Sequence, residues 1–163
     1  MSENSANSGR SSTIIATRVN WLGNRLVTTA SATYGQIGLG FLDARLLYLL
    51  GRRPDITAAR IAEIIGVDAA AVSRAVKSLK ARKLIAEARG PLRSLSLTDD
   101  GWALCHLTEK ISDEREVRLL RGFTDHEAEQ MLDLLNRMLD NMGEVALLAE
   151  QVPQVVSQAK SES

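Results

Sequence analysis

The side chains in this chain that could do chemistry are mostly basic, and they gather between residues 58 and 93. This stretch carries eight basic and three acidic side chains, although the whole chain is neutral, with 20 Lys and Arg against 20 Asp and Glu. Residues 99–150 have the opposite bias, with five basic and thirteen acidic side chains. A basic block next to an acidic one concentrates positive potential on one surface. The distribution therefore favours a nucleic acid as partner.

Residues 69–81 can place several of these side chains on one helix face. Apolar residues recur at helical spacing through the segment and would pack inward: Val72, Ala75, Val76 and Leu79. The residues between them would then point outward, and we predict that they contact DNA: Ala70, Ala71, Ser73, Arg74, Lys77 and Ser78. Arg74 can bond a guanine edge or a phosphate, and Lys77 a phosphate. A solvated helix face is the alternative interpretation.

A preceding helix and a tight turn must position this face. The sequence ITAARIAEIIGV, from Ile56 to Val67, predicts that helix, with Ala62 small enough for a second helix to cross it closely. Gly66 tolerates the left-handed backbone that the turn requires. Asp68 is a good N-cap for the second helix. These offsets together indicate a helix-turn-helix.

A short hairpin follows the helix pair. The segments LIAEAR and LRSLSLT are joined by Gly90-Pro91, and in the second one Leu95 and Leu97 alternate with serines, which is typical of a half-buried strand. Arg89 and Arg93 flank the tip, where a basic side chain can enter the minor groove of DNA. A helix-turn-helix with such a "wing" presents one helix to the major groove and one ribbon to the neighbouring backbone.

The predicted fold class is mainly α, an α+β winged helix-turn-helix with dimerisation helices on both sides. Apolar periodicity predicts helices over residues 13–32, 41–50 and 99–121, with Gly51 ending the second, and a capping box of Thr124 and Glu127 opens the last one. Their apolar faces exceed what one small winged unit can cover, which favours a homodimer over a helical bundle within one chain. The predicted divisions are a tail (1–12), an N-terminal dimerisation helix and loop (13–40), the DNA-binding region (41–98), C-terminal dimerisation helices (99–150) and a second tail (151–163).

Other functions have little support in the residue types. The single Cys105 and two distant histidines form no metal-ligand cluster, there is no glycine-rich phosphate loop, and Asp99-Asp100 suits a helix start better than an acid-base pair. We therefore predict no catalytic residues, no metal and no cofactor. No apolar run reaches the about 18 residues that span a bilayer. The first residues lack a signal-peptide pattern, and a cytoplasmic location without membrane partners is the expectation.

The sequence resembles the multiple-antibiotic-resistance regulator (MarR) family from about Leu22 to Met142. The most telling pieces are VSRAVKSLKARKLI, LSLTDDG and FTDHEAEQMLDLLNRML. The resemblance implies a homodimeric winged-helix regulator, usually a repressor, that binds a pseudo-palindromic operator, with Ser73 and Arg74 on the contact positions of the recognition helix. The family usually has a longer wing with Asp-Arg at its tip. This chain has only ARGPLRSL there, so Arg89 or Arg93 would take the place of that pair.

The resemblance also implies a response to a small molecule, often an aromatic carboxylate, or to cysteine oxidation. By position, the family's effector pocket would be lined by Trp21, Arg25, Tyr34, Arg45 and Trp102. The two tryptophans could equally be core residues. A sensing role for Cys105 competes with its being a small buried apolar residue. A winged-helix adaptor or antirepressor that binds another protein is the main alternative function, and such a protein would show no steep salt dependence on duplex DNA.

Overall fold

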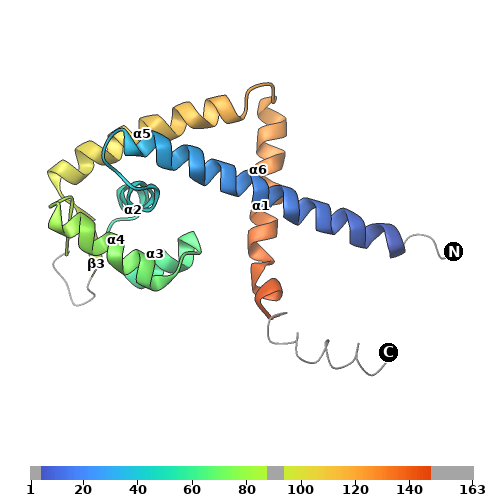
Figure 1. The fold of residues 1–163 in the computed structure, drawn as a ribbon, viewed down its shortest axis with the longest axis horizontal. Helices are drawn as coiled ribbons and strands as arrows, with labels where there is room; N and C mark the ends of the chain where they lie inside the picture. The colour runs from blue at the N-terminus through green and yellow to red at the C-terminus, as the bar shows by residue number, and fades with distance from the viewer. Residues whose placement is uncertain (1–4, 88–93, 148–163) are drawn as a thin grey trace. The chain divides into compact units, whose positions relative to one another are not determined.

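The computed structural model describes the backbone of residues 5–87 and 94–147, and the side chains from Ile14 onward. Six helices and three short strands lie in the described residues (Figure 1). In chain order they are α1 (Ser5–Gly35), α2 (Phe41–Arg52), β1 (Ile56–Thr57), α3 (Ala58–Ile65), α4 (Ala69–Ala81), β2 (Ile85–Glu87), β3 (Ser94–Leu97), α5 (Asp99–Leu119) and α6 (Asp125–Asp140). The predicted fold class, mainly helical with a winged helix-turn-helix, is confirmed. The chain divides into two units, residues 1–113 and 114–163, with the boundary inside α5.

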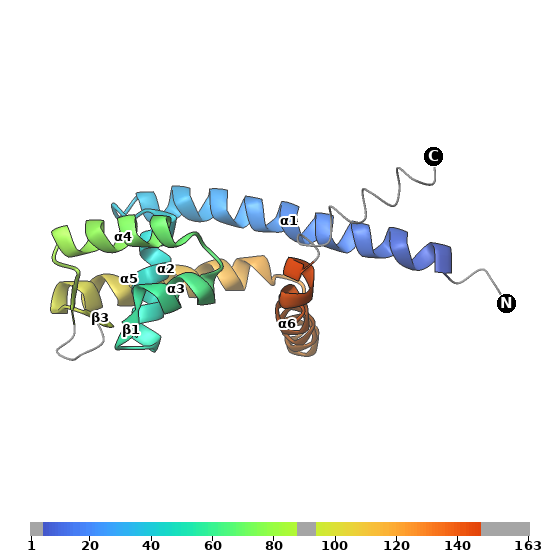
Figure 2. The same cartoon turned by 90° about the horizontal axis from the view of Figure 1, so that it is seen from below.

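Helix α2 forms the centre of the first unit. In both views it passes between α1, α4 and α5 (Figure 1, Figure 2). Its side chains Leu46, Leu47 and Leu50 are at most 1% exposed. Burying three leucines contributes about 1.5–3 kcal/mol each relative to leaving them in water. The core of the first unit is therefore built around this helix.

Helix α1 is longer than its apolar pattern predicts. It begins at Ser5 rather than near Thr13, so that most of the segment expected to be a tail belongs to the helix. A polar segment lacks the material for a core, but this composition does not by itself end a helix when no proline interrupts it. The helix ends at Gly35, three residues beyond the predicted end, and Gly38 adopts a φ of +70° in the turn that follows.

Gly51 is not the helix stop that the sequence indicated, because α2 continues to Arg52. Its role is close packing: a Cβ at this position would lie 2.6 Å from Sγ of Cys105 on α5. A second close approach occurs at Gly101, where a Cβ would lie 1.9 Å from the carbonyl oxygen of Leu84. Both glycines allow α5 to lie directly against the rest of the winged-helix unit.

The helix-turn-helix forms with the predicted signals. Gly66 adopts the left-handed conformation, with φ at +62°, directly after α3. The Asp68 carboxylate accepts a hydrogen bond from the backbone N–H of Ala71 at 3.0 Å and caps α4. Ile61 and Ala62 are buried beneath the crossing of the two helices. The prediction from turn chemistry is confirmed at each of these positions.

The sheet has three strands rather than the two of a simple hairpin. Its order is β1-β3-β2, with both pairs antiparallel, Ile56 opposite Leu95 and Ile85 opposite Leu97. Strand β1 was not predicted, because two residues are too few to show alternation. Since β3 is the central strand, Ser94 is buried together with Leu95, and the expected serine-out, leucine-in alternation is wrong at Ser94.

The C-terminal helices begin where the capping residues predict. Oγ1 of Thr98 accepts a hydrogen bond from Gly101 N–H at the start of α5. At α6, Thr124 and Glu127 form the predicted capping box. After a turn at Asn141 the helix resumes over residues 142–147, two residues before the bend expected at Gly143. None of the helices in the described part of the chain has the length and apolar content that a membrane span requires.

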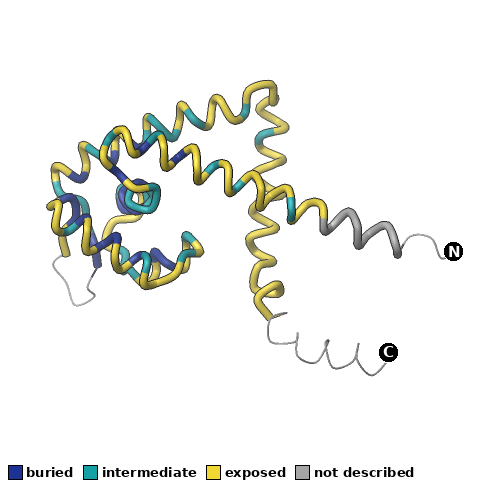
Figure 3. Tube along the Cα trace, in the orientation of Figure 1, coloured by how far each residue is buried: buried dark blue, intermediate teal, exposed yellow. Residues whose placement is uncertain are grey.

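In the second unit, the residues that the structure describes, 114–147, include no buried position. Helix α6 contains no buried residue, and Figure 3 shows exposed positions along nearly its whole length. Its apolar residues include Leu132 and Leu139, which are 60% and 67% exposed. A large exposed apolar surface of this kind marks an interaction site.

Candidate nucleic-acid interface

Helix α4 has one buried face and one free face, as its sequence predicts. The buried face consists of Val72, Ala75, Val76 and Leu79. Of the six predicted contact residues on this helix, Ala71 is half-buried and the other five are exposed: Ala70, Ser73, Arg74, Lys77 and Ser78. The small side chains Ala70 and Ser73 leave room for a partner to approach the helix backbone. The geometry therefore brings these six residues to one accessible surface.

Most basic side chains around this surface are already paired. Arg60 binds Glu63 on α3, Lys80 binds Glu87 on β2, and Arg82 lies 3.9 Å from the Asp43 carboxylate. Among the described residues, in contrast, Arg74 and Lys77 have no ion-pair or hydrogen-bond partner. Two exposed cations without a protein partner on the free face of a second helix are suited to bind phosphate or base edges.

The ends of α4 are held to neighbouring elements. Asp68 caps its first turn, as described above. At its other end, the backbone N–H of Leu84 donates to the carbonyl of Leu79 at 3.0 Å, and the hydroxyl of Thr98 donates to the carbonyl of Lys83 at 2.7 Å. Lys83 adopts a φ of +58° in this turn. The Asp68 cap thus fixes the start of α4, and the hydrogen bonds at Lys83 and Leu84 connect its end to the start of α5.

The base of the wing is a pair of antiparallel strands. Strand β2 pairs with β3 over Ile85–Glu87. The predicted contact residues Arg89 and Arg93 lie outside the described residues.

Comparison with known proteins relates this architecture to a family. A model of the MarR family matches residues 37–93, which include α2, the helix-turn-helix and strand β2. The crystal structure of a MarR/EmrR family transcriptional regulator from Acinetobacter sp. ADP1 has a TM-score of 0.75 and 29% identity, over 82% of this chain and 97% of that one. Residues 37–93 match the MarR family, and the fold over most of the chain is similar to that of a MarR/EmrR regulator. MarR-family proteins are DNA-binding transcription regulators and not enzymes.

Two further MarR-like folds were solved with DNA. The S. aureus MepR–DNA complex has a TM-score of 0.69 and 22% identity, covering 78% of this chain and 95% of that one. A MarR-family regulator from Listeria monocytogenes, complexed with a 26-mer DNA, has a TM-score of 0.76 and 19% identity over 83% and 93% of the two chains. At these identities the likeness concerns the fold. A search of curated proteins returned no match.

The structure separates the residues predicted to bind an effector into two groups. Trp21 and Arg25 line one open hollow along α1, together with Arg18, Leu22 and Asn24. The guanidinium of Arg18 lies over the Trp21 ring, 5.3 Å from its centroid. Trp21 is 55% exposed in the single chain and is therefore not a core residue. An accessible indole with arginines beside it can hold an aromatic anion.

The other three predicted effector residues have contacts within the chain. Tyr34 is buried, with its hydroxyl 2.9 Å from that of Ser112. Arg45 donates to the carbonyl of Ile65 at 3.2 Å, and burial lowers the pKa of its guanidinium. Trp102 is partly exposed on α5, with its ring 5.6 Å from that of His106.

Cys105, a residue of α5, is fully buried against α2. Its Sγ donates to the carbonyl of Leu47 at 3.3 Å. Burial, and secondarily the carboxylate of Glu109, raise the pKa of the thiol. Because oxidants react with an exposed thiolate, both observations are unfavourable for a sensing cysteine. They fit the alternative of a small buried apolar residue.

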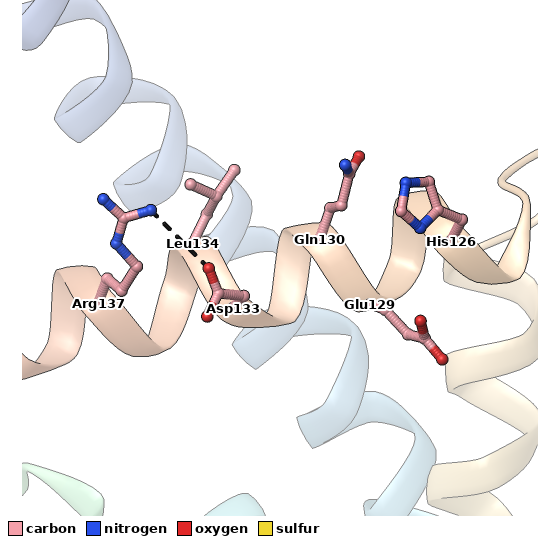
Figure 4. A pocket seen from close by; sticks show the side chains of 6 residues that line it. All are labelled: His126, Glu129, Gln130, Asp133, Leu134 and Arg137. Carbon is pink, nitrogen blue, oxygen red and sulfur yellow. Dashed lines mark ion pairs between the residues drawn. The ribbon is translucent and has the colours of Figure 1, made fainter.

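A second hollow, on α6, was not predicted from the sequence. Figure 4 shows its lining, which consists of His126, Glu129, Gln130, Asp133, Leu134 and Arg137. Asp133 and Arg137 form an ion pair at 3.8 Å, one helical turn apart. Like the hollow on α1, it is lined by a single helix, but it has no tryptophan on which an aromatic ligand could stack, and its Arg137 is already paired with Asp133. We read this surface as the polar side of α6.

Proposed function

We propose that this protein is a homodimeric repressor that binds a pseudo-palindromic operator through α4 and is released by an aromatic acid. The observation that carries the proposal is the free face of α4, where Arg74 and Lys77 are exposed and, among the described residues, unpaired. We assign base contacts to Ser73 and Arg74 and a phosphate contact to Lys77. Ala70, Ala71 and Ser78 would lie against the groove, and Arg89 and Arg93 would extend contact to the minor groove.

The dimer is supported by apolar surface that the single chain leaves exposed. On α6 and the helical segment after it, one such face consists of Met131, Leu135, Met138 and Met142. On α1 the exposed apolar residues include Ile15, Val19 and Leu22. We propose that a second copy covers both faces, so that residues 13–40 and 99–150 serve dimerisation. Two-fold symmetry then predicts half-sites about one helical turn of DNA apart, roughly 34–36 Å.

For the effector we propose the hollow on α1 that contains Trp21 and Arg25. An indole offers a stacking surface, and a guanidinium offers paired donors for a carboxylate. Since the surrounding face of α1 is part of the proposed dimer contact, a ligand bound there can favour one arrangement of the two protomers over another. A regulator of an operator works where the chromosome lies, and we accordingly propose a cytoplasmic location.

A salt titration on duplex DNA tests the proposal. Fluorescence anisotropy should show tight binding to a duplex from the region upstream of the protein's own gene and weaker binding to a scrambled duplex. Because phosphate contacts release counterions, log K should fall with log salt by about 0.9 for each contacted phosphate. A panel of aromatic acids and coenzyme A thioesters should include a compound that releases the operator.

Two outcomes would point to the alternative functions. Binding without steep salt dependence, or no duplex binding at all, would favour a protein-binding adaptor or antirepressor. Loss of operator binding on mild oxidation, restored by reduction and absent in Cys105→Ala, would favour redox sensing despite the burial of the thiol.

A further inference from the structure

Arg45 connects α2 to the corner of the helix-turn-helix. The side chain is half-buried, and its Nη2 donates to the carbonyl oxygen of Ile65 at 3.2 Å. The ring of Phe41, one turn earlier on α2, lies 5.4 Å from the guanidinium carbon. The guanidinium stays charged when partly buried, because arginine does not lose its proton in proteins. Its place is thus set by a hydrogen bond on one side and an aromatic ring on the other.

The carbonyl that Arg45 holds belongs to the last residue of α3. Helix ends leave carbonyl groups without a helical partner, and a cation is favourable there because it opposes the helix dipole. The next residue, Gly66, makes the left-handed turn, and α4 starts at Ala69. A displacement of the Ile65 carbonyl is therefore passed through three residues to the start of α4.

Helix α2 also contacts the far end of α4. The carboxylate of Asp43, two residues before Arg45, lies 3.9 Å from the guanidinium of Arg82, the C-cap of α4. Two residues near the start of α2 thus contact both ends of α4. Arg45 contacts the corner before α4, and Asp43 contacts its C-cap. The two contacts lie at opposite ends of α4, where they can affect its angle to the rest of the unit.

We propose that Arg45 is a positioning residue for DNA recognition, which fixes the corner between α3 and α4 so that Ser73 and Arg74 meet the base edges. This assignment rests on the proposed role of α4 in operator binding. It replaces the role in effector binding predicted for Arg45, because its guanidinium is already bonded to the Ile65 carbonyl. Base contacts need more accurate placement than phosphate contacts, so loss of the corner should reduce specificity more than affinity.

The test compares operator and scrambled duplex for Arg45→Met, which keeps the length of the side chain and removes its donors. We expect the ratio of the two affinities to fall about tenfold, the size of one lost base contact. The salt slope should stay unchanged, since the phosphate contacts remain. Arg45→Lys should restore part of the ratio, because its ammonium can donate to the same carbonyl.

Arg52→Met is the matched control. Arg52 is also an α2 arginine beside an aromatic ring, that of Tyr48 at 4.4 Å, but its ion-pair partner is Glu109 on α5. This variant should keep the wild-type ratio. If Arg45→Met does not unfold cooperatively, Arg45→Gln takes its place, since a polar amide is tolerated at a half-exposed site.

Three results would overturn the assignment. A folded Arg45→Met or Arg45→Gln with the wild-type ratio shows that the corner does not need Arg45. An unchanged ratio together with loss of effector release returns Arg45 to the effector site. A wild-type protein with no preference for its operator overturns the proposed function, and this assignment with it.

Discussion

The packed winged-helix unit and helix α6 use similar residues in opposite ways. Around α2, leucines are almost completely buried, and the fit is so close that Gly51 and Gly101 leave no room for a methyl group. On α6, leucines and methionines at equally regular spacing are all exposed. Periodicity alone does not distinguish these cases. The winged-helix unit completes its core within one chain, whereas the apolar face of α6 is left exposed, which is the surface that the proposed dimer would cover.

The largest effect is expected from a charge placed in the apolar face of α6. Met138→Glu would place a carboxylate in the proposed dimer contact, where an unpaired buried charge costs about 3–5 kcal/mol. We expect dissociation into monomers and loss of tight operator binding, since a single half-site remains. Sedimentation velocity gives the mass, and circular dichroism shows whether the winged-helix unit remains folded.

Asn136→Glu is the control for that substitution. It introduces the same residue into the same helix, but on the polar side, where Asp133 and Arg137 already lie. The control should sediment as the wild type does. A Met138→Glu protein that kept the wild-type mass would show that α6 does not form the dimer contact.

Within the packed unit, a single methyl group should have the next largest effect. Gly51→Ala would bring Cβ to 2.6 Å from Sγ of Cys105. Overpacking of this kind costs up to about 3 kcal/mol. We expect a lower urea midpoint with an unchanged m-value, and an unchanged dimer mass.

The double variant Gly51→Ala/Cys105→Ala isolates the cause of that loss. Removing the sulfur makes room for the methyl group, so the double variant should be more stable than the sum of the two single changes indicates. Additive losses would mean that the contact with the sulfur is not the cause, because the next nearest atom, a ring carbon of Trp102 at 3.5 Å, lies at an ordinary contact distance.

The sequence could predict those features that depend on residues close together in the chain. Turn and cap chemistry acts over a few residues, and the roles of Gly66, Asp68 and Thr124 were all predicted from their neighbours. The spacing of the apolar residues of α4 also settled its inner face. The assignment of Gly51 failed because its neighbour, Cys105, is distant in sequence. From the sequence alone, a glycine that ends a helix cannot be distinguished from one that allows close contact between two helices.

In the candidate site, too, local features could be predicted and contacts between separate elements could not. The free face of α4 follows from the helical period once its apolar side is known. The ion pairs that occupy the surrounding basic residues could not be predicted, because Arg82–Asp43 and Lys80–Glu87 join separate elements. The bond from Arg45 to Ile65 was missed for the same reason, and position in the family suggested an effector role instead. Sequence patterns therefore indicated which residues face outward but not which of them are free.

The free face of α4 should tolerate substitution that its buried face does not. Arg74→Ala should weaken operator binding by about 1–3 kcal/mol and relax preference at one base step. Lys77→Ala should weaken all duplexes alike and lower the salt slope by about one phosphate contact. Anisotropy titrations at several salt concentrations separate the two effects. Unfolding midpoints should match the wild type in both variants, and unchanged DNA binding in both would remove α4 from the interface.

The smallest expected effect concerns the start of α6, which in the absence of a core depends on local bonds. The carboxylate of Glu127 accepts hydrogen bonds from N–H and Oγ1–H of Thr124, both at 2.8 Å, and these bonds lower the pKa of Glu127. A carboxylate whose pKa is lowered in the folded state stabilises that state above its unfolded pKa, and the contribution is lost as pH falls through the folded pKa. Fraying of α6 should therefore begin on acidification below the usual glutamate range. An NMR titration of the Glu127 carboxyl carbon should show its inflection at lower pH in the wild type than in Thr124→Val, which keeps the backbone donor and removes the hydroxyl. Coincident inflections would mean that the hydroxyl adds nothing and that the backbone N–H of Thr124 alone lowers the pKa of Glu127.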